Sequence, residues 1–189
     1  MKTTNYLLAL ILTASSIGLF AQTQKVNTEK STISWLGKKI GGQHEGLIKL
    51  KSGSLEEKSG KIVSGFFVID MKSLTNTDLT DPGYNQKLVG HLKSDDFFGV
   101  EKFPTATLII TKATKFSNGK ATVTGNLTIK GKTETITFNL VKKENIYTAT
   151  IEVDRSKFDV KYGSNSFFDS LGDKAIDDIF ILDIKLLIN

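Results

Sequence analysis

The residue types that most often carry catalysis are sparse in this chain. Its 189 residues include two histidines, His44 and His91, which lie far apart in the sequence, and no cysteine. The absence of cysteine excludes disulfides, thiolate metal sites, iron–sulfur clusters and a lipid-modified N-terminal cysteine. The sequence also lacks the HExxH, GxSxG and P-loop patterns, and no GxGxxG follows a predicted strand. These observations predict a protein that is not an enzyme.

Adjacent acidic residues are the remaining candidates for metal binding. They form two pairs, Asp95-Asp96 and Asp177-Asp178. Neighbouring side chains on an extended chain point to opposite faces, so neither pair converges on one ion. The sequence therefore predicts no metal site and no cofactor, although carboxylates from distant strands could still meet in the fold.

Other polar residues favour local roles. Ser94-Asp95-Asp96 is typical of a turn that ends a helix, with side chains bonded to nearby backbone. Asp154-Arg155 is interpreted as a local ion pair. Tyr162 and Ser164 either contact the polar head group of a ligand or close a turn.

The N-terminal segment predicts export. Lys2 precedes an apolar stretch, Tyr6 to Leu12, and small residues follow up to Ala21. We expect residues 1–21 to be a signal peptide and residues 22–189 to form one domain, located in the periplasm or secreted. A membrane anchor is the alternative, but the apolar stretch is too short for a bilayer core of about 30 Å.

Charge and hydropathy narrow the possible partners. The net charge of +5 is modest, and lysines and arginines are scattered rather than gathered in one run. Nucleic acid is therefore not a predicted partner. After the signal segment no uninterrupted apolar run exceeds four residues, so we expect no stable membrane insertion.

An apolar–polar alternation with a period of two dominates the rest of the chain. Val123, Leu127 and Ile129, for example, alternate with threonines and other polar residues, which places one apolar face on a strand. Alternation leaves the phase of residues 66–69 open, because both faces are apolar there. The predicted strands are residues 32–38, 45–51, 62–70, 105–111, 121–130, 135–140, 147–153 and 180–188.

Short turns join several of these strands and make neighbours antiparallel. Asn118-Gly119 and Lys130-Gly131-Lys132 are typical hairpin turns. A longer interruption contains residues 84–94, where Leu88, His91 and Leu92 recur at helical spacing. The pattern predicts an all-β fold of about eight antiparallel strands with one short helix, and it leaves a closed barrel and a two-sheet sandwich both open.

One block of the sequence resembles a known family. His91–Phe98 (HLKSDDFF) with Val100–Thr107 (VEKFPTAT) resembles the central signature of the YceI-like family of exported lipid-binding proteins. Further segments resemble that family in order and spacing, and together they cover essentially all of residues 22–189. These segments are 60–62, 70–74, 123–131, 137–138, 154–158 and 161–164. The resemblance implies an eight-stranded antiparallel lipocalin-like β-barrel, with a helix near its mouth, that binds a long isoprenoid or other amphiphilic lipid; it also implies a possible homodimer.

Elementary energetics agree with such a ligand. Burial of apolar surface stabilises a bound chain by about 0.8 kcal/mol per methylene, so a long chain needs no catalytic group to be held. Each phenylalanine could also serve as ordinary core. His91 is the expected contact for the ligand's polar head group. The predicted ligand-binding residues are Phe66, Leu88, His91, Leu92, Phe97, Phe98, Phe103, Leu127, Ile129, Phe138, Phe158, Tyr162, Phe167 and Phe168.

The leading hypothesis is a soluble exported carrier or reservoir for an isoprenoid-like lipid. A second hypothesis is a filled barrel that acts as a scaffold or adhesion module and exposes a contiguous apolar patch. A third is an enzyme acting on a lipid, which requires convergent titratable groups inside the cavity.

Overall fold

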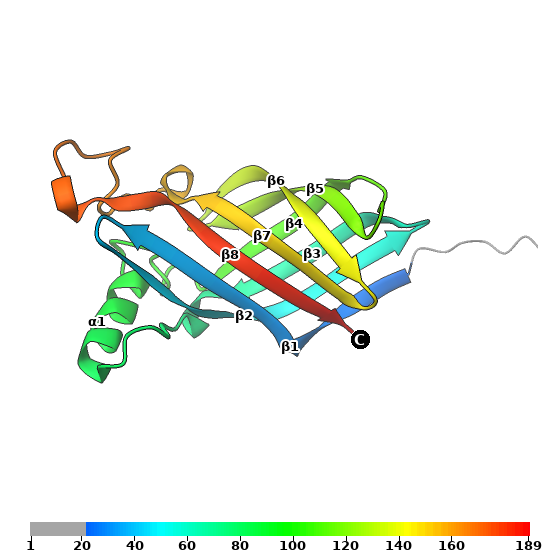
Figure 1. Ribbon diagram of the computed structural model, residues 1–189, viewed down its shortest axis with the longest axis horizontal. Coiled ribbons are helices and arrows are strands. Elements are labelled where there is room, and N and C mark those ends of the chain that lie inside the picture. The colour runs from blue at the N-terminus through cyan, green and yellow to red at the C-terminus, as the bar shows by residue number, and fades with distance from the viewer. Residues whose placement is uncertain (1–21) are drawn as a thin grey trace, which may run out of the picture.

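Eight antiparallel strands close into a single barrel in the computed structural model, which describes residues 22–189 (Figure 1). The predicted signal peptide, residues 1–21, lies outside the described residues. Each strand pairs with the next along the chain, and the last strand pairs with the first, so a barrel forms and not a sandwich. The strands are β1 (Gln22–Lys39), β2 (Gly42–Lys58), β3 (Lys61–Asp70), β4 (Thr105–Ala113), β5 (Lys120–Ile129), β6 (Lys132–Lys143), β7 (Ile146–Asp154) and β8 (Ile176–Ile188).

Two-residue turns set the register of the hairpins. Asn118 and Gly119 have φ angles of 49° and 73°, and Lys130 and Gly131 have φ angles of 50° and 73°. Positive φ at both central residues is the type I′ geometry, whose twist matches that of the strands it joins. The hairpin turns expected at these two places are therefore confirmed.

The helix α1 (Pro82–Lys93) lies at one end of the barrel, which we call the mouth, and the C-terminus lies at the other end (Figure 1). Asp81 caps the helix by accepting a hydrogen bond from the backbone amide of Tyr84, at 2.9 Å. Ser94 ends the helix as expected, since its amide and hydroxyl both donate to the carbonyl of His91. The 3₁₀ turns are η1 (Met71–Ser73), η2 (Arg155–Phe158) and η3 (Gly172–Lys174). No helix within residues 22–189 is long and apolar enough to cross a membrane.

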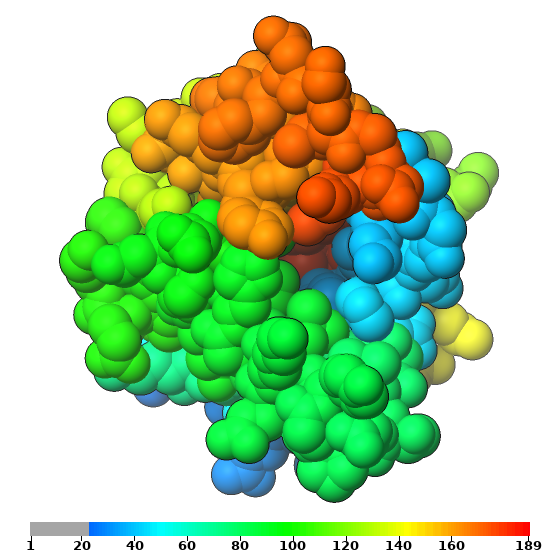
Figure 2. All heavy atoms as spheres, turned by 90° about the vertical axis from the view of Figure 1, so that its left-hand side faces the viewer, coloured from blue at the N-terminus to red at the C-terminus, as the bar shows by residue number. Residues whose placement is uncertain are grey.

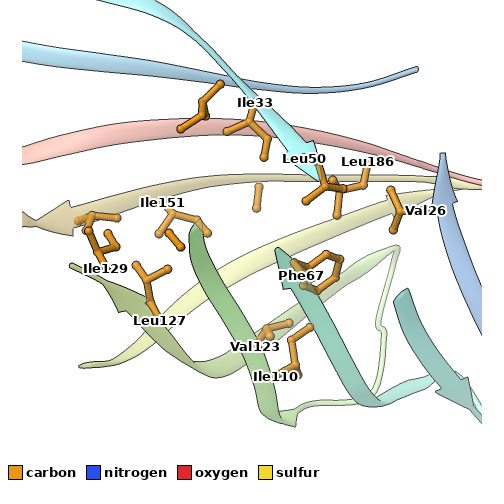
Figure 3. Packing of buried hydrophobic residues seen from close by; sticks show 14 of the residues in the cluster. Val26, Ile33, Leu50, Phe67, Ile110, Val123, Leu127, Ile129, Ile151 and Leu186 are labelled. Carbon is orange, nitrogen blue, oxygen red and sulfur yellow. The ribbon is translucent and has the colours of Figure 1, made fainter. Parts of the chain in front are cut away.

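The hydrophobic core lies inside the barrel, where alternate residues of every strand face inward. Figure 3 shows these side chains from Leu127 and Ile129 on one side of the view to Leu186 and Val26 on the other. The structure also decides the phase of β3, because Phe67 is buried whereas Phe66 is 46% exposed on the outer surface.

Candidate ligand-binding cavity

The core does not fill the barrel at its mouth. An apolar cavity of about 190 Å³ lies there, walled mainly by aliphatic and aromatic side chains. Viewed from the α1 end, Figure 2 shows a hollow bounded by the helical region in green, the β7–β8 connection in orange and the β1–β2 hairpin in blue. An apolar cavity of about 150 Å³ is large enough to take up a small hydrocarbon. The mouth can therefore admit part of an apolar chain.

A smaller apolar chamber of about 60 Å³ lies deeper in the barrel. Both spaces are lined by Ile33 and Ile184, which are paired directly across β1 and β8. Because they share this part of the wall, the two spaces adjoin each other along the barrel. Phe138 and Tyr147 are among the residues that line the deeper chamber.

A close backbone approach on β2 brings the connection to α1 against the barrel. Leu47 and Thr75 exchange backbone hydrogen bonds of 3.3 and 2.9 Å, so residues near Thr75 extend the sheet alongside β2. Gly46 permits this approach, because a Cβ atom there would overlap the carbonyl group of Thr75. The same carbonyl accepts a 3.0 Å hydrogen bond from Nε1 of Trp35, which satisfies the indole while its ring lines the cavity.

Aromatic rings from four segments meet at the mouth. The imidazole of His91 packs edge-on against Tyr162, with ring centroids 4.4 Å apart, and against Phe97 at 5.8 Å. Phe98 contacts Phe97 at 5.2 Å and Phe180 of β8 at 6.3 Å. Edge-to-face contacts at these distances are favourable, so this group stabilises one side of the opening. It also places His91 between the helix and the cavity.

Arg155 is the buried cation of the mouth, and its side chain is only 2% exposed. The guanidinium donates four hydrogen bonds of 2.9–3.0 Å to backbone carbonyls, those of Asp177, Val160, Tyr162 and Ile176. The planar fork of arginine suits such multiple bonding. Arg155 thereby ties η2, the β7–β8 connection and the start of β8 together beside the cavity that it partly lines.

The ion pair expected between Asp154 and Arg155 is replaced by another one. Arg155 pairs with Asp178 at 3.4 Å, whereas Asp154 caps η2 by accepting hydrogen bonds from the amide and hydroxyl of Ser156. Burial lowers the pKa of Arg155, although the negative charges of Asp178 and Asp154 act in the opposite direction. The pairing differs from the prediction because the adjacent side chains of Asp154 and Arg155 point in different directions, and Asp178 of β8 lies close to Arg155.

His44 lies on the other side of the mouth and also lines the cavity. Its Nδ1 atom is 2.8 Å from Oδ2 of Asp78, whose other oxygen accepts hydrogen bonds from the amide of Glu45 and from Asn76. Burial alone would raise the pKa of Asp78, but these hydrogen bonds outweigh it and hold the pKa below its usual value. The carboxylate therefore orients His44 at the opening.

The predicted ligand-binding residues fall into three groups. Those that line the larger cavity are Leu88, His91, Leu92, Phe97, Phe98, Leu127 and Ile129, and Phe138 lines the deeper chamber. Three others line neither space: Tyr162 packs on His91, Phe158 is buried and Phe103 lies against Gly131. Phe66, Phe167 and Phe168 are exposed, and Lys161 lies over the ring of Phe167.

Several lining residues were not predicted. Trp35, Phe180 and Leu182 lie on β1 and β8. Leu182 continues the alternation of Ile184 and Leu186 with polar residues and could have been assigned to an inner face, whereas Phe180 has isoleucines on both sides, so alternation leaves its face open. No local signal marks Arg155 as a lining residue, because two of its four hydrogen-bond partners, Asp177 and Ile176, lie more than 20 residues away in the sequence. Within residues 22–189 no three histidine, aspartate or glutamate side chains gather as a metal-binding group.

Comparison with solved structures supports the fold. The crystal structure of BcnA from Burkholderia cenocepacia covers 85% of this chain and 98% of its own, at 27% identity and a TM-score of 0.67. A polyisoprenoid-binding domain from Saccharophagus degradans, implicated in plant cell wall breakdown, covers 88% of this chain and 97% of its own. Its identity is 13% and its TM-score is 0.59, so it shows a likeness of fold alone.

Sequence comparison identifies the family. A UPF0312 protein from Shewanella denitrificans is 36% identical over 62 residues, and the matched part spans 33% of this chain and 32% of that relative. The family model of the YceI-like domain matches residues 24–187, which is nearly all of the described chain. The protein therefore belongs to the YceI-like domain family.

Proposed function

We propose that this protein binds the apolar chain of an amphiphilic lipid, such as an isoprenoid, inside its barrel and serves as an exported carrier or reservoir. The observation that carries the proposal is the apolar cavity of about 190 Å³ that opens at the mouth. The likeness of fold to a polyisoprenoid-binding domain supports the same ligand class.

The walls of the cavity explain why a chain would bind. Each methylene that leaves water for this space contributes about 0.8 kcal/mol, so affinity grows with chain length. Two of the charged groups at the mouth are already engaged, since Arg155 is bonded to carbonyls and His44 to Asp78, while Lys38 and Lys39 also line the opening. At the opening, which His91, Lys38 and Lys39 all line, a neutral or anionic polar head group fits these surroundings.

The two other hypotheses fit the cavity less well. A scaffold barrel with a filled interior does not account for the two adjoining apolar spaces. An enzyme acting on a lipid needs titratable groups that converge on a reacting atom. His91 lies against aromatic rings, and no serine, threonine or tyrosine is among the described residues that line the cavity beside the His44–Asp78 pair.

The direct test is organic extraction of the protein purified without detergent, followed by mass spectrometry of the extract. A recovered amphiphilic lipid supports the proposal. The delipidated protein is then titrated with geranylgeraniol while the fluorescence of Trp35 is followed, because this single tryptophan lines the cavity. A protein that yields no lipid and shows no saturable binding refutes the proposal.

A pair of variants on one strand makes the titration specific to the interior. Ala106 of β4 is buried and lines the cavity, so Ala106→Phe places a ring in the space that the chain would occupy. Ile109 of the same strand is 46% exposed on the outer face, so Ile109→Phe is the matched control. We expect binding to weaken strongly in the first variant only, and equal weakening in both would contradict an interior site.

A further inference from the structure

The two apolar spaces meet at one level of the barrel. Ile33 of β1 is paired with Ile184 of β8, and Ile184 is in turn paired with Ala149 of β7. All three side chains face inward, and Ile33 and Ile184 line both spaces. A chain that passes from the mouth into the deeper chamber therefore crosses the layer formed by these three residues.

On β7 and β8 the lining residues of the deeper chamber that lie farthest from the mouth are Tyr147 and Leu186, which we call its floor. Tyr147 of β7 is paired with Leu186 of β8, and both residues line the chamber. The buried ring of Tyr147 donates its hydroxyl to Glu57 at 2.7 Å, and Lys142 donates to the same oxygen at 2.7 Å. These bonds join β2, β6 and β7 and keep the ring of Tyr147 in position.

The protonation states strengthen this anchor. Burial and the nearby Glu57 carboxylate raise the pKa of Tyr147, so its hydroxyl keeps its proton and remains a donor. Burial alone would raise the pKa of Glu57, but the hydrogen bonds from Lys142 and Tyr147 outweigh it and lower the pKa. The hydrogen bond from Tyr147 in the floor to the Glu57 carboxylate therefore persists at neutral pH.

The strand register gives the depth of the space above the floor. Along β8 the lining residues run from Ile176 at the mouth to Leu186 at the floor, a separation of ten residues. At about 3.4 Å per residue and a strand tilt of about 40°, this corresponds to about 25 Å along the barrel axis. A fully extended chain advances about 1.2 Å per bond, so a chain that reaches the floor along this path has about 20 bonds. Because the two spaces measure only about 190 and 60 Å³, side chains along the path must move apart to admit such a chain.

We propose that the floor formed by Tyr147 and Leu186 limits the length of the bound chain to about 20 bonds, or about five isoprene units. This inference rests on the proposed function, because it concerns the chain that the cavity accepts. Longer chains leave their extra carbons outside the mouth, where they gain no burial. Tyr147 is thus a residue that determines specificity for chain length.

The test is a series of linear primary alcohols, from about 8 to about 26 carbons, titrated against the delipidated protein with Trp35 fluorescence as the signal. We expect the dissociation constant to fall by up to about fourfold for each added methylene. This gain should stop at about 20 chain bonds. A gain that continues unchanged to the longest soluble alcohol overturns the length limit.

Variants at the layer above the floor test the assignment. Ala149→Leu fills the passage to the deeper chamber, so the limit should shorten by about five bonds. Thr150→Leu, at an exposed neighbouring position of β7, is the matched control and should leave the limit unchanged. If circular dichroism shows that Ala149→Leu does not fold, Leu140→Phe fills the same chamber from β6.

The outcomes separate the two proposals. If the alcohols bind and the limit is the same in the wild type and the filled variant, the role of the floor is refuted while lipid binding stands. If no alcohol of any length binds, the proposed function fails and the length limit fails with it.

Discussion

Replacement of Arg155 by methionine tests whether this residue holds the mouth of the barrel together. Methionine has a similar length but cannot donate a hydrogen bond. The Arg155→Met variant therefore leaves four backbone carbonyls without their donor and the half-buried carboxylate of Asp178 without its cation.

The magnitude follows from these lost contacts. Removing one member of a buried ion pair destabilises proteins by about 3–5 kcal/mol, because the remaining charge stays uncompensated. Asp177, Tyr162 and Ile176 are at least partly exposed, so water can replace the lost donor at their carbonyls, whereas the carbonyl of Val160 stays buried. We therefore take about 4 kcal/mol for the whole substitution. For a domain of this size the melting temperature should fall by about 8–16 °C.

The free energy of unfolding is measured by urea titration with Trp35 fluorescence as the signal. Lys161→Met is the matched control, because Lys161 pairs with Asp159 at 3.0 Å while both side chains are about half exposed. Exposed pairs contribute about 0–1 kcal/mol, so this variant should be nearly as stable as the wild type. A loss below about 1 kcal/mol for Arg155→Met would refute the view that the buried guanidinium organises the mouth.

Three further predictions concern the acid stability, the lining and the backbone of the barrel. The folded pKa of Glu57 lies below its ordinary value of 4.5, so its contribution to stability is complete above that pH and is lost as the pH falls through the folded pKa. Glu57→Gln should lower the urea midpoint at pH 7 and flatten its fall in acid; an unchanged acid profile would contradict this linkage. Phe98→Ala should weaken geranylgeraniol binding by about tenfold in the fluorescence titration, whereas Phe66→Ala on the outer face should not. Gly46→Ala should cost more than about 2 kcal/mol in thermal unfolding, because its Cβ would overlap the carbonyl of Thr75, and a neutral effect would show that this segment shifts freely.

Much of the fold could be predicted because its signals are local. Alternation along residues 121–130 assigns Val123, Leu127 and Ile129 to one face, and all three are buried inside the barrel. The hairpin turns and the helix are equally local, since each depends on the conformational preferences of a few neighbouring residues. The family signature begins at His91, in the last turn of that helix, and continues into the residues that follow it.

The mouth could be predicted only in part. Leu88, His91 and Leu92 share a helix face, so their common position at the cavity follows from helical spacing. Phe66 shows where this reasoning fails. Phe66 and Phe67 are consecutive, so their sequence does not show which of them faces inward. The pairing of β3 with β2 and β4 places Phe67 inside the barrel.

Local sequence patterns were enough to place the strands, two of their turns and the helix, and to predict an apolar interior, although β1 and β2 extend well beyond their predicted ranges. Local alternation left open whether β1 pairs with β8, which residue pairs with Arg155, and whether the interior is hollow, and the folded barrel shows all three. Local patterns depend on the preferences of neighbouring residues, whereas closure, ion pairing and unfilled volume depend on side chains that are far apart in the chain. Barrel closure, the long-range ion pair and the unfilled volume therefore depend on the arrangement of all eight strands around one axis.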